Sequence, residues 1–261
     1  MCWRTDGSLS DLSSDITDDA VLGGRLRLLQ PATGHRVGHD ALLLAASVPE
    51  DARRAVDLGA GVGSAGLALA VRLTEIEVTL VEIDPAMATL ARENAGRQEP
   101  DLRARVVVVA ADVASLARPS GPAAPAAAGA DVVLMNPPFN DPARHRVSPH
   151  ERRAHAHMAA DATLDMWVRA AERLLEPGGR LCLIHRPEAL EAVLGTLKGR
   201  FGAAAIRPVH PGPAAPAIRI LVIALKGRRT PPSLLPGLVL ADEAGRPSEA
   251  AERVLRGGAG I

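Results

Sequence analysis

The sequence is poor in aromatic residues and contains no tyrosine. Phe, Trp and Tyr together make up 2% of the 261 residues, whereas hydrophobic residues as a whole make up 47%. Aliphatic side chains, chiefly Ala, Val and Leu, must therefore fill the core, and their share is sufficient to do so. A chain of this length suits one α/β domain of ordinary size with a short appendage.

Cysteine is also scarce, which excludes a disulfide framework. Cys2 lies at the terminus, and Cys182 lies within the apolar run 181–184, which predicts a buried free thiol. No Cys-x-x-Cys pair is present, and the histidines between residues 145 and 157 lack regular ligand spacing, so we expect no metal site. This cysteine usage favours a reducing, cytoplasmic location.

The chain lacks an excess of charge and lacks long apolar runs. With 30 basic and 30 acidic residues, it has no overall basic field, so nucleic-acid binding would depend on a local patch. No apolar stretch reaches the roughly 20 residues that a membrane span needs. The N-terminal segment is acidic and has no apolar core, so we do not expect a signal peptide; its aspartates are Asp6, Asp11, Asp15, Asp18 and Asp19.

Predicted strands and helices alternate along most of the chain. This alternation is typical of an α/β, doubly wound, mostly parallel sheet of Rossmann-like type, here with a closing antiparallel strand. The predicted elements are a hairpin at 16–30 turning at Gly23-Gly24, a helix at 41–46 capped by Asp40, strand 55–58, helix 64–73, strand 77–83, helix 85–98, strand 105–110, strand 131–135, helix 164–175, strand 180–184, helix 187–198, and an antiparallel pair at 204–209 and 217–226. The Val-rich strand at 105–110 reads as buried.

Composition divides the chain into three parts. Residues 1–16 are polar and predicted to be flexible, residues 17–228 form the domain, and residues 229–261 are rich in Pro, Gly and Arg and predict a weakly structured tail. Within the domain, the Pro/Ala-rich segment 119–130 is low in complexity and predicts a flexible loop.

A glycine-rich turn, Asp57-Leu58-Gly59-Ala60-Gly61-Val62-Gly63, joins a predicted strand to a predicted helix. This context makes a Gly-rich match credible as a cofactor loop, since Gly permits positive φ and close ligand approach. Gly59, Gly61 and Gly63 match the G-x-G-x-x-G rule for dinucleotides only loosely. The acidic Asp57 suits the ammonium of a methionine moiety better than a pyrophosphate, which favours S-adenosylmethionine (SAM) over NAD.

Two further carboxylates follow the next strands. Glu82 stands where a carboxylate would accept bonds from both ribose hydroxyls, and Asp112 could receive the amino group of an adenine. The alternatives are structural: Asp84, followed by Pro85, reads as a helix cap, and Asp112 could cap a helix starting near Val113.

A strand that ends in Asn136-Pro137-Pro138-Phe139 reads as a catalytic loop. The prolines cannot donate ladder hydrogen bonds, so the sheet ends here, where open α/β sheets bind ligands. The Asn136 side-chain oxygen and the Pro137 carbonyl could accept bonds from an amino group whose nitrogen becomes positive during methyl transfer, and Phe139 could stack on a flipped base. The alternative is a proline-stiffened turn with Phe139 in the core.

These motifs together resemble the small-domain SAM-dependent methyltransferases with an Asn-Pro-Pro-Tyr/Phe motif. More closely, the chain looks like the bacterial tRNA1(Val) (adenine-N6)-methyltransferase group, because Arg36-Val37-Gly38-His39-Asp40-Ala41-Leu42-Leu43-Leu44 is similar to that group's Lys-Val-Gly-Thr-Asp-Gly-Ile-Leu-Leu. The resemblance implies that Asp40 helps to organise the SAM pocket. It also implies SAM contacts from Asp57 and residues 59–63, ribose and adenine contacts from Glu82 and Asp112, and a target base at residues 136–139. At position 139 this chain has Phe where that group usually has Tyr. Phe at this position of the motif also occurs in rRNA guanine-N2 methyltransferases.

A basic run follows the catalytic loop, and its arginines are Arg144, Arg146, Arg152 and Arg153. Its position suggests contacts with the phosphates of an RNA substrate, with tRNA favoured; the alternative is a solvated basic loop. The leading hypothesis is a SAM-dependent transferase that methylates adenine N6 in tRNA. Competing readings are rRNA guanine-N2 or protein glutamine methylation, a DNA adenine methyltransferase, an NAD-dependent oxidoreductase, and a non-catalytic binding protein on a decayed fold.

Overall fold

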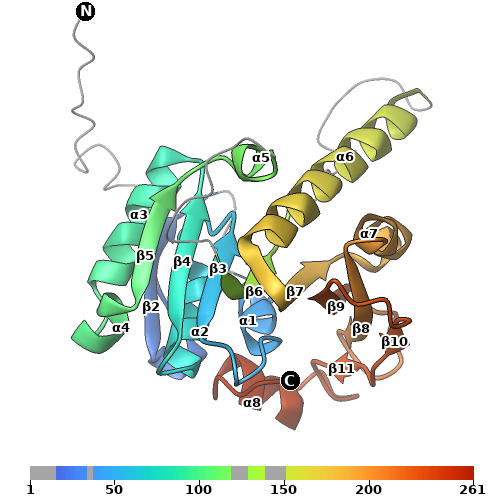
Figure 1. Ribbon diagram of the computed structural model, residues 1–261. Helices are drawn as coiled ribbons and strands as arrows, with labels where there is room; N and C mark the ends of the chain where they lie inside the picture. Colours follow the sequence, from blue (N-terminus) through green and yellow to red (C-terminus); the bar gives the residue numbers. More distant parts are fainter. Residues whose placement is uncertain (1–15, 34–37, 119–128, 139–150) are drawn as a thin grey trace, which may run out of the picture.

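The computed structural model describes residues 16–33, 38–118, 129–138 and 151–261, with the backbone alone for residues 151–162. Its centre is a nine-stranded sheet with the order β10-β8-β9-β7-β6-β3-β4-β5, to which β11 adds by pairing with β8. Neighbours among β7, β6, β3, β4 and β5 are parallel, and β9 is antiparallel to both β7 and β8. The predicted doubly wound, mostly parallel sheet with a closing antiparallel pair is therefore confirmed (Figure 1).

The elements follow the predicted order. The sheet strands are β3 (Arg54–Leu58), β4 (Glu77–Glu82), β5 (Val106–Ala110), β6 (Ala130–Met135), β7 (Leu175–His185), β8 (Phe201–His210), β9 (Arg219–Lys226), β10 (Ser233–Leu234) and β11 (Leu238–Val239). The helices are α1 (His39–Ala46), α2 (Ser64–Arg72), α3 (Pro85–Gly96), α4 (Pro100–Ala104), α5 (Val113–Leu116), α6 (Glu151–Leu174), α7 (Leu190–Leu197, after the 3-10 turn η4 at Pro187–Ala189) and α8 (Glu249–Leu255). The predicted hairpin is present as β1 (Ile16–Val21) and β2 (Leu26–Pro31), joined by the 3-10 turn η2 (Leu22–Gly24).

The central strands read as continuous apolar runs because helices cover both faces of the sheet. On one face, Leu67 and Leu69 of α2 pack with Leu80 and Leu134 of the sheet. On the other face, α6 and α7 pack over a second cluster that includes Met135. Cys182 is buried in the first of these clusters as a free thiol, as predicted, and burial raises its pKa to about 12.

Two sequence predictions about individual elements are wrong. The strand β5 is not buried: it is the edge strand of the sheet, and its Val107 is 49% exposed. Helix α6 begins at Glu151, not near Leu164, so it has 24 residues and includes half of the basic run. Figure 1 shows its first half extending beyond the edge of the sheet. The sequence pattern missed this half because a projecting helix needs no apolar stripe facing the core.

The predicted weak structure of the tail is also wrong. Strands β10 and β11 both pair in parallel with β8, and Ser248 caps α8 through a bond from the Ala251 amide of 3.0 Å. The Ile261 amide donates to the Ala46 carbonyl at the end of α1 over 3.1 Å. The boundary between residues 228 and 229 stays a prediction, and the flexible segments expected at 1–15 and 119–128 lie outside the described residues.

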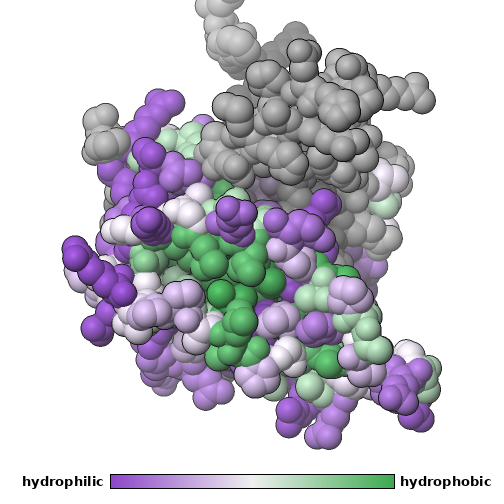
Figure 2. Space-filling model, turned by 90° about the vertical axis from the view of Figure 1, so that its right-hand side faces the viewer, coloured by the Kyte–Doolittle hydropathy of each residue, from purple (hydrophilic) through white to green (hydrophobic). Residues whose placement is uncertain are grey.

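The surface on the side of β8 and β10 is partly apolar. Figure 2 shows a hydrophobic area there, bordered by hydrophilic residues. Leu234 of β10 is 75% exposed. The backbone of β10 is thus paired with β8, while the side chain of Leu234 remains in contact with water.

Candidate cofactor and catalytic site

Three predicted site residues lie in a row at the carboxyl edge of the sheet. Leu58 of β3 is in register with Val81 of β4 on one side and with Met135 of β6 on the other. Adjacent strands lie about 4.8 Å apart, so the next residues along the three strands are neighbours. These residues are Glu82, Gly59 and Asn136. The structure thus brings together the predicted ribose carboxylate, the glycine loop and the catalytic amide.

The glycine loop turns through left-handed backbone conformations. Gly59, Gly61 and Gly63 have φ values of 65°, 57° and 89°, which side-chain-bearing residues rarely adopt. Gly59 is constrained a second time, because a Cβ there would lie 2.3 Å from the indole of Trp167 on α6. The backbone therefore requires glycine at these positions, as the sequence predicted, and α6 packs directly against the loop.

A fourth glycine, Gly66, was missed. Its amide donates to Asp57 Oδ2 over 2.9 Å, and a Cβ on it would lie 2.2 Å from Leu80 Cδ2. Residues 61, 63 and 66 satisfy G-x-G-x-x-G in full, so the reading of the rule as loosely met is wrong. The third glycine of that pattern serves close packing of helix on strand, which is what Gly66 does here.

Asp57 lies beneath the loop and is only 3% exposed. Burial raises its pKa to about 7, opposed by the bond from the Gly66 amide and assisted by the charge of Glu82. Because its carboxylate receives an amide of the first turn of α2, Asp57 fixes the start of that helix and hence the loop before it. Its predicted contact with SAM remains a prediction.

Glu82 braces the loop from the neighbouring strand. One carboxylate oxygen accepts from the Gly61 amide over 2.7 Å, and the other accepts from the Asp84 amide over 2.8 Å. Each carboxylate oxygen can accept a second bond, so both could still receive a donor from a ligand. Glu82 is 8% exposed, and these two bonds hold its carboxylate in a fixed orientation.

The remaining predicted carboxylates have structural partners. Asp84 caps α3, as predicted, by accepting from Ala86 and Met87 amides over 2.8 and 3.1 Å. Asp112 caps α5 by accepting from the Ala114 amide over 2.8 Å, which confirms the cap interpretation; an added contact with an adenine remains a prediction.

Asp40 was wrongly assigned as a helix cap. The residue before α1 is Gly38, which is the N-cap. Asp40 lies in the first turn and accepts from the guanidinium of Arg219, on β9. A role for Asp40 in organising the SAM pocket stays a prediction.

The catalytic loop is described only in its first three residues. Asn136 is half-buried, Pro137 is buried and Pro138 is exposed, whereas Phe139 lies outside the described residues, as do Arg144 and Arg146. Of the other two predicted RNA contacts, Arg152 and Arg153, the backbone lies in α6. This pair therefore lies on a helix and not in a loop, and its contact with RNA stays a prediction.

One polar group at the catalytic edge has no counterpart among the predictions. His185 ends β7, and the register of Met135 with Leu183 places it close to Pro137. Its Nδ1 accepts from the Arg186 amide over 2.9 Å, and burial lowers its pKa. The sequence feature that could have identified His185 is its position directly after the predicted strand 180–184.

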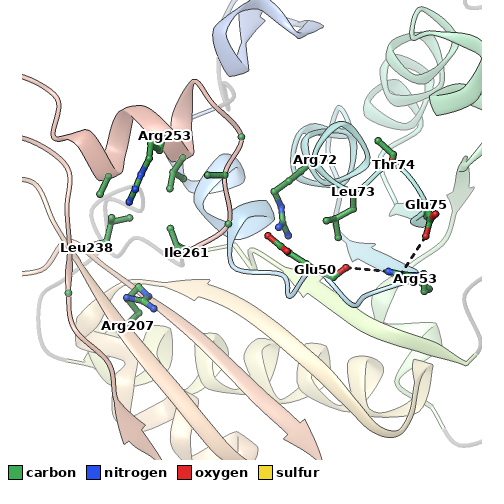
Figure 3. A pocket seen from close by; sticks show the side chains of 16 residues that line it. Glu50, Arg53, Arg72, Leu73, Thr74, Glu75, Arg207, Leu238, Arg253 and Ile261 are labelled. Atoms are coloured by element: carbon green, nitrogen blue, oxygen red, sulfur yellow. Dashed lines mark hydrogen bonds and ion pairs between the residues drawn. The ribbon is translucent and has the colours of Figure 1, made fainter.

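A cavity of about 860 Å³ lies away from these residues. It opens at the amino ends of the strands, between Arg53, Arg72, Arg207 and Arg253, and Figure 3 shows these side chains around it. It contains none of the predicted site residues. In the described ranges, no three His, Cys, Asp or Glu side chains form a cluster suited to a metal ion, and no helix is long and apolar enough to cross a membrane.

The fold and the loop define the class of protein. A mostly parallel sheet with an antiparallel strand, a glycine loop after β3 and an acidic residue ending β4 constitute the Rossmann-like methyltransferase fold. The pattern of the methyltransferase small domain matches residues 35–206. The chain therefore belongs to the methyltransferase small-domain family.

Individual relatives are consistent with this assignment. The chain is 32% identical over 169 residues to a tRNA1(Val) (adenine(37)-N6)-methyltransferase of Porphyromonas gingivalis, covering 62% of this chain and 63% of that one. It is 31% identical over 196 residues to the protein of that name from Dickeya chrysanthemi, covering 74% and 73%. A Streptomyces avermitilis ribosomal RNA large subunit methyltransferase G is 35% identical over 134 residues, covering 51% and 28%. The chain thus spans less than two thirds of the length of the Porphyromonas relative.

Solved structures show the same fold. A predicted O-methyltransferase from Agrobacterium tumefaciens has a TM-score of 0.68 and 31% identity, covering 85% of this chain and 98% of that one. The glycopeptide N-methyltransferase MtfA complexed with SAM has a TM-score of 0.50 and 15% identity, covering 74% of this chain and 100% of that one.

Proposed function

We propose that this protein is a SAM-dependent N-methyltransferase that modifies the exocyclic amine of a base in RNA, with adenine N6 of a tRNA as the favoured substrate. The observation that carries the proposal is the row of Glu82, Gly59 and Asn136 on adjacent strands. This row sets a cofactor loop and a hydrogen-bonding amide side by side. The names of the Porphyromonas and Dickeya relatives support adenine in tRNA.

The residues around the glycine loop fit SAM. Glu82 is fixed by two backbone amides and has acceptor capacity left for the ribose hydroxyls. At Gly61 no atom lies within 4 Å of an added Cβ, which leaves room for close approach of a ligand. Asp57 supports the loop from below, and Asp112 and Asp40 lie at the same edge of the sheet. SAM, when bound, supplies an electrophilic methyl group on a sulfonium. The loop residues hold and orient it.

The Asn136 side chain and the Pro137 carbonyl supply the catalytic contacts. An aromatic amine is a poor nucleophile because its lone pair is delocalised into the ring. Two acceptors aimed at the amino hydrogens favour the pyramidal nitrogen and stabilise the positive charge that develops there. Pro138 stiffens the loop, and Phe139 stacks on the flipped base. Alignment of the nitrogen with the methyl group provides the remaining acceleration.

RNA reaches the site along the helix that follows the catalytic loop. Arg152 and Arg153 lie at the start of α6, whose first half projects beyond the sheet (Figure 1). Together with Arg144 and Arg146 they contact the phosphates on either side of the flipped nucleotide. An enzyme acting on tRNA works in the cytoplasm.

Two relatives suggest other acceptors. The Streptomyces relative is named for ribosomal RNA, which keeps guanine N2 in rRNA as the second candidate. The Agrobacterium protein is described as a predicted O-methyltransferase. A hydroxyl offers one hydrogen to the two acceptors of the catalytic loop, whereas an amino group offers two, so the loop favours nitrogen.

The proposal is tested with purified protein, methyl-labelled SAM, and total tRNA and rRNA from cells lacking the gene. Nucleoside mass spectrometry should find labelled N6-methyladenosine in tRNA. Labelled N2-methylguanosine in rRNA would show that the acceptor is guanine N2 in rRNA and not adenine N6 in tRNA. Label at a ribose oxygen, or in no RNA, would contradict the proposal.

A further inference from the structure

The side chain of Asn94, on α3, joins the N-terminal hairpin to the glycine loop. It is fully buried, with 0% exposure. Its Oδ1 accepts from the Leu29 amide over 2.7 Å, and its Nδ2 donates to the Leu29 carbonyl over 2.9 Å and to the Val62 carbonyl over 3.0 Å. Leu29 belongs to β2, and Val62 lies between Gly61 and Gly63. One side-chain amide therefore contacts two segments that are distant in sequence: Leu29 is 65 residues away from Asn94, and Val62 is 32 residues away.

These three bonds require an amide of this size. Leu29 has both of its backbone polar groups paired to one side chain, as a strand residue has with a neighbouring strand. The third bond goes to the loop. Asp has no hydrogen to donate to the two carbonyls, and an aliphatic side chain would leave three backbone groups without this partner. For the buried Val62 carbonyl the cost is about 1–3 kcal/mol.

The bond to Val62 fixes one peptide group of the cofactor loop. The Val62 carbonyl points to Asn94, while the amide of the same peptide, that of Gly63, donates to the Ala60 carbonyl over 2.8 Å. The peptide between Ala60 and Gly61 is held through the Gly61 amide by Glu82. Glycines alone would allow the loop many conformations, so Glu82 and Asn94 select one of them from opposite ends.

The hairpin has a second attachment to the same helix. Asp18 of β1 accepts from Arg97, the C-cap of α3, over 2.6 Å, and also pairs with Arg27 of β2 over 3.3 Å. The hairpin thus rests on α3 at two points, of which only Asn94 also reaches the loop.

We infer that Asn94 is a positioning residue that couples the order of the β1–β2 hairpin to the binding of SAM. The inference rests on the proposed function for the identity of the ligand. A ligand that orders the loop strengthens the Val62 bond and with it the attachment of Leu29. By thermodynamic reciprocity, a well-attached hairpin must then raise the affinity for SAM.

The test compares Asn94→Ala and Asn94→Asp with Leu197→Ala, a core substitution on α7 that touches neither segment and serves as the control for lost stability. Calorimetry gives the SAM affinity, and hydrogen exchange reports on the amides of residues 26–30. We expect both Asn94 variants to bind SAM about tenfold more weakly and the control to bind as the wild type does. SAM should slow exchange in the wild-type hairpin and leave it unchanged in Asn94→Ala.

Equal SAM affinities in Asn94→Ala and in the control would overturn the inference, as would wild-type hairpin exchange that SAM does not alter. Should the Asn94 variants fail to fold, Asp18→Ala weakens the other attachment without touching the loop. It should lower SAM affinity by about fivefold, and unchanged affinity would again overturn the coupling. A wild-type protein that binds no SAM would overturn the proposed function itself, and the two failures are therefore distinguishable.

Discussion

Asp40 and Arg219 form an ion pair that ties α1 to the antiparallel strand at the catalytic edge. Arg219 Nε lies 2.8 Å from Asp40 Oδ2, and the two side chains are 27% and 24% exposed. Arg219 begins β9, next to Ile220, which is in register with His185 at the end of β7. The pair therefore fixes the first turn of α1 near the end of β7, the strand next to the one that ends at Asn136.

We expect this pair to contribute cooperatively to stability. Half-buried pairs with a short charge-assisted bond contribute about 1 kcal/mol. In a double-mutant cycle of Asp40→Ala and Arg219→Ala, urea unfolding should show a coupling energy of that order. Strictly additive losses would show that the two side chains act independently.

Asp57 predicts an unusual pH dependence in the absence of SAM. Its pKa in the folded protein is raised to about 7 from 3.8, so between these values the folded state holds a proton that the unfolded state has released. Folding is therefore favoured most below the unfolded pKa, and this contribution is lost as pH rises towards about 7.

The variant Asp57→Asn isolates that contribution. Its amide oxygen can still accept from Gly66, but it does not titrate. The stability of Asp57→Asn relative to wild type, measured by chemical denaturation, should increase between pH 4.5 and pH 8 by an amount on the order of a few kcal/mol. A difference that does not change with pH would contradict the buried, shifted carboxyl group.

The glycines of the loop should respond unequally to alanine. Gly59→Ala introduces both an unfavourable φ and a clash with Trp167, whereas Gly61→Ala introduces only the unfavourable φ, since no atom lies within 4 Å of its added Cβ. We expect Gly61→Ala to cost about 1–2 kcal/mol and Gly59→Ala to cost clearly more in denaturant unfolding. Equal losses would mean that Trp167 does not restrict the loop.

We expect substitutions of the arginines at the start of α6 to change RNA binding and no other property. Charge reversal by Arg152→Glu and Arg153→Glu should raise KM for tRNA and flatten its salt dependence, because each lost phosphate contact lowers the salt slope by about one unit. Reversal at Arg228 and Arg229, after β9, is the matched control. An unchanged KM in the first variant, or the same rise in both, would remove the assignment.

The local elements and the site row were predictable because each depends on short stretches of sequence. Short apolar segments mark β3, β4 and β6, and the ends of parallel strands meet at one edge, so Glu82, the loop and Asn136 were expected at the same edge. That they are direct neighbours follows from the strand order β4-β3-β6. Asp84 could be recognised as a cap because Pro85 follows it.

What the sequence could not show depends on contacts between distant residues. Asp40 looked like a cap until its partner Arg219, 179 residues away, was placed. The exposure of β5 follows from its place at the edge of the sheet, which no local pattern encodes. The tail looked weakly structured because Pro and Gly dominate it, yet pairing with β8 and packing on α1 order it.

Asn136→Ala gives the most direct test of the central claim, that the amide at the end of β6 acts on the transition state. The variant and the wild type should be compared for SAM affinity by calorimetry and for single-turnover methylation of tRNA. We predict unchanged SAM affinity and a methylation rate lower by at least about 100-fold, as expected for loss of a bond made chiefly in the transition state. A rate close to that of the wild type would contradict the account.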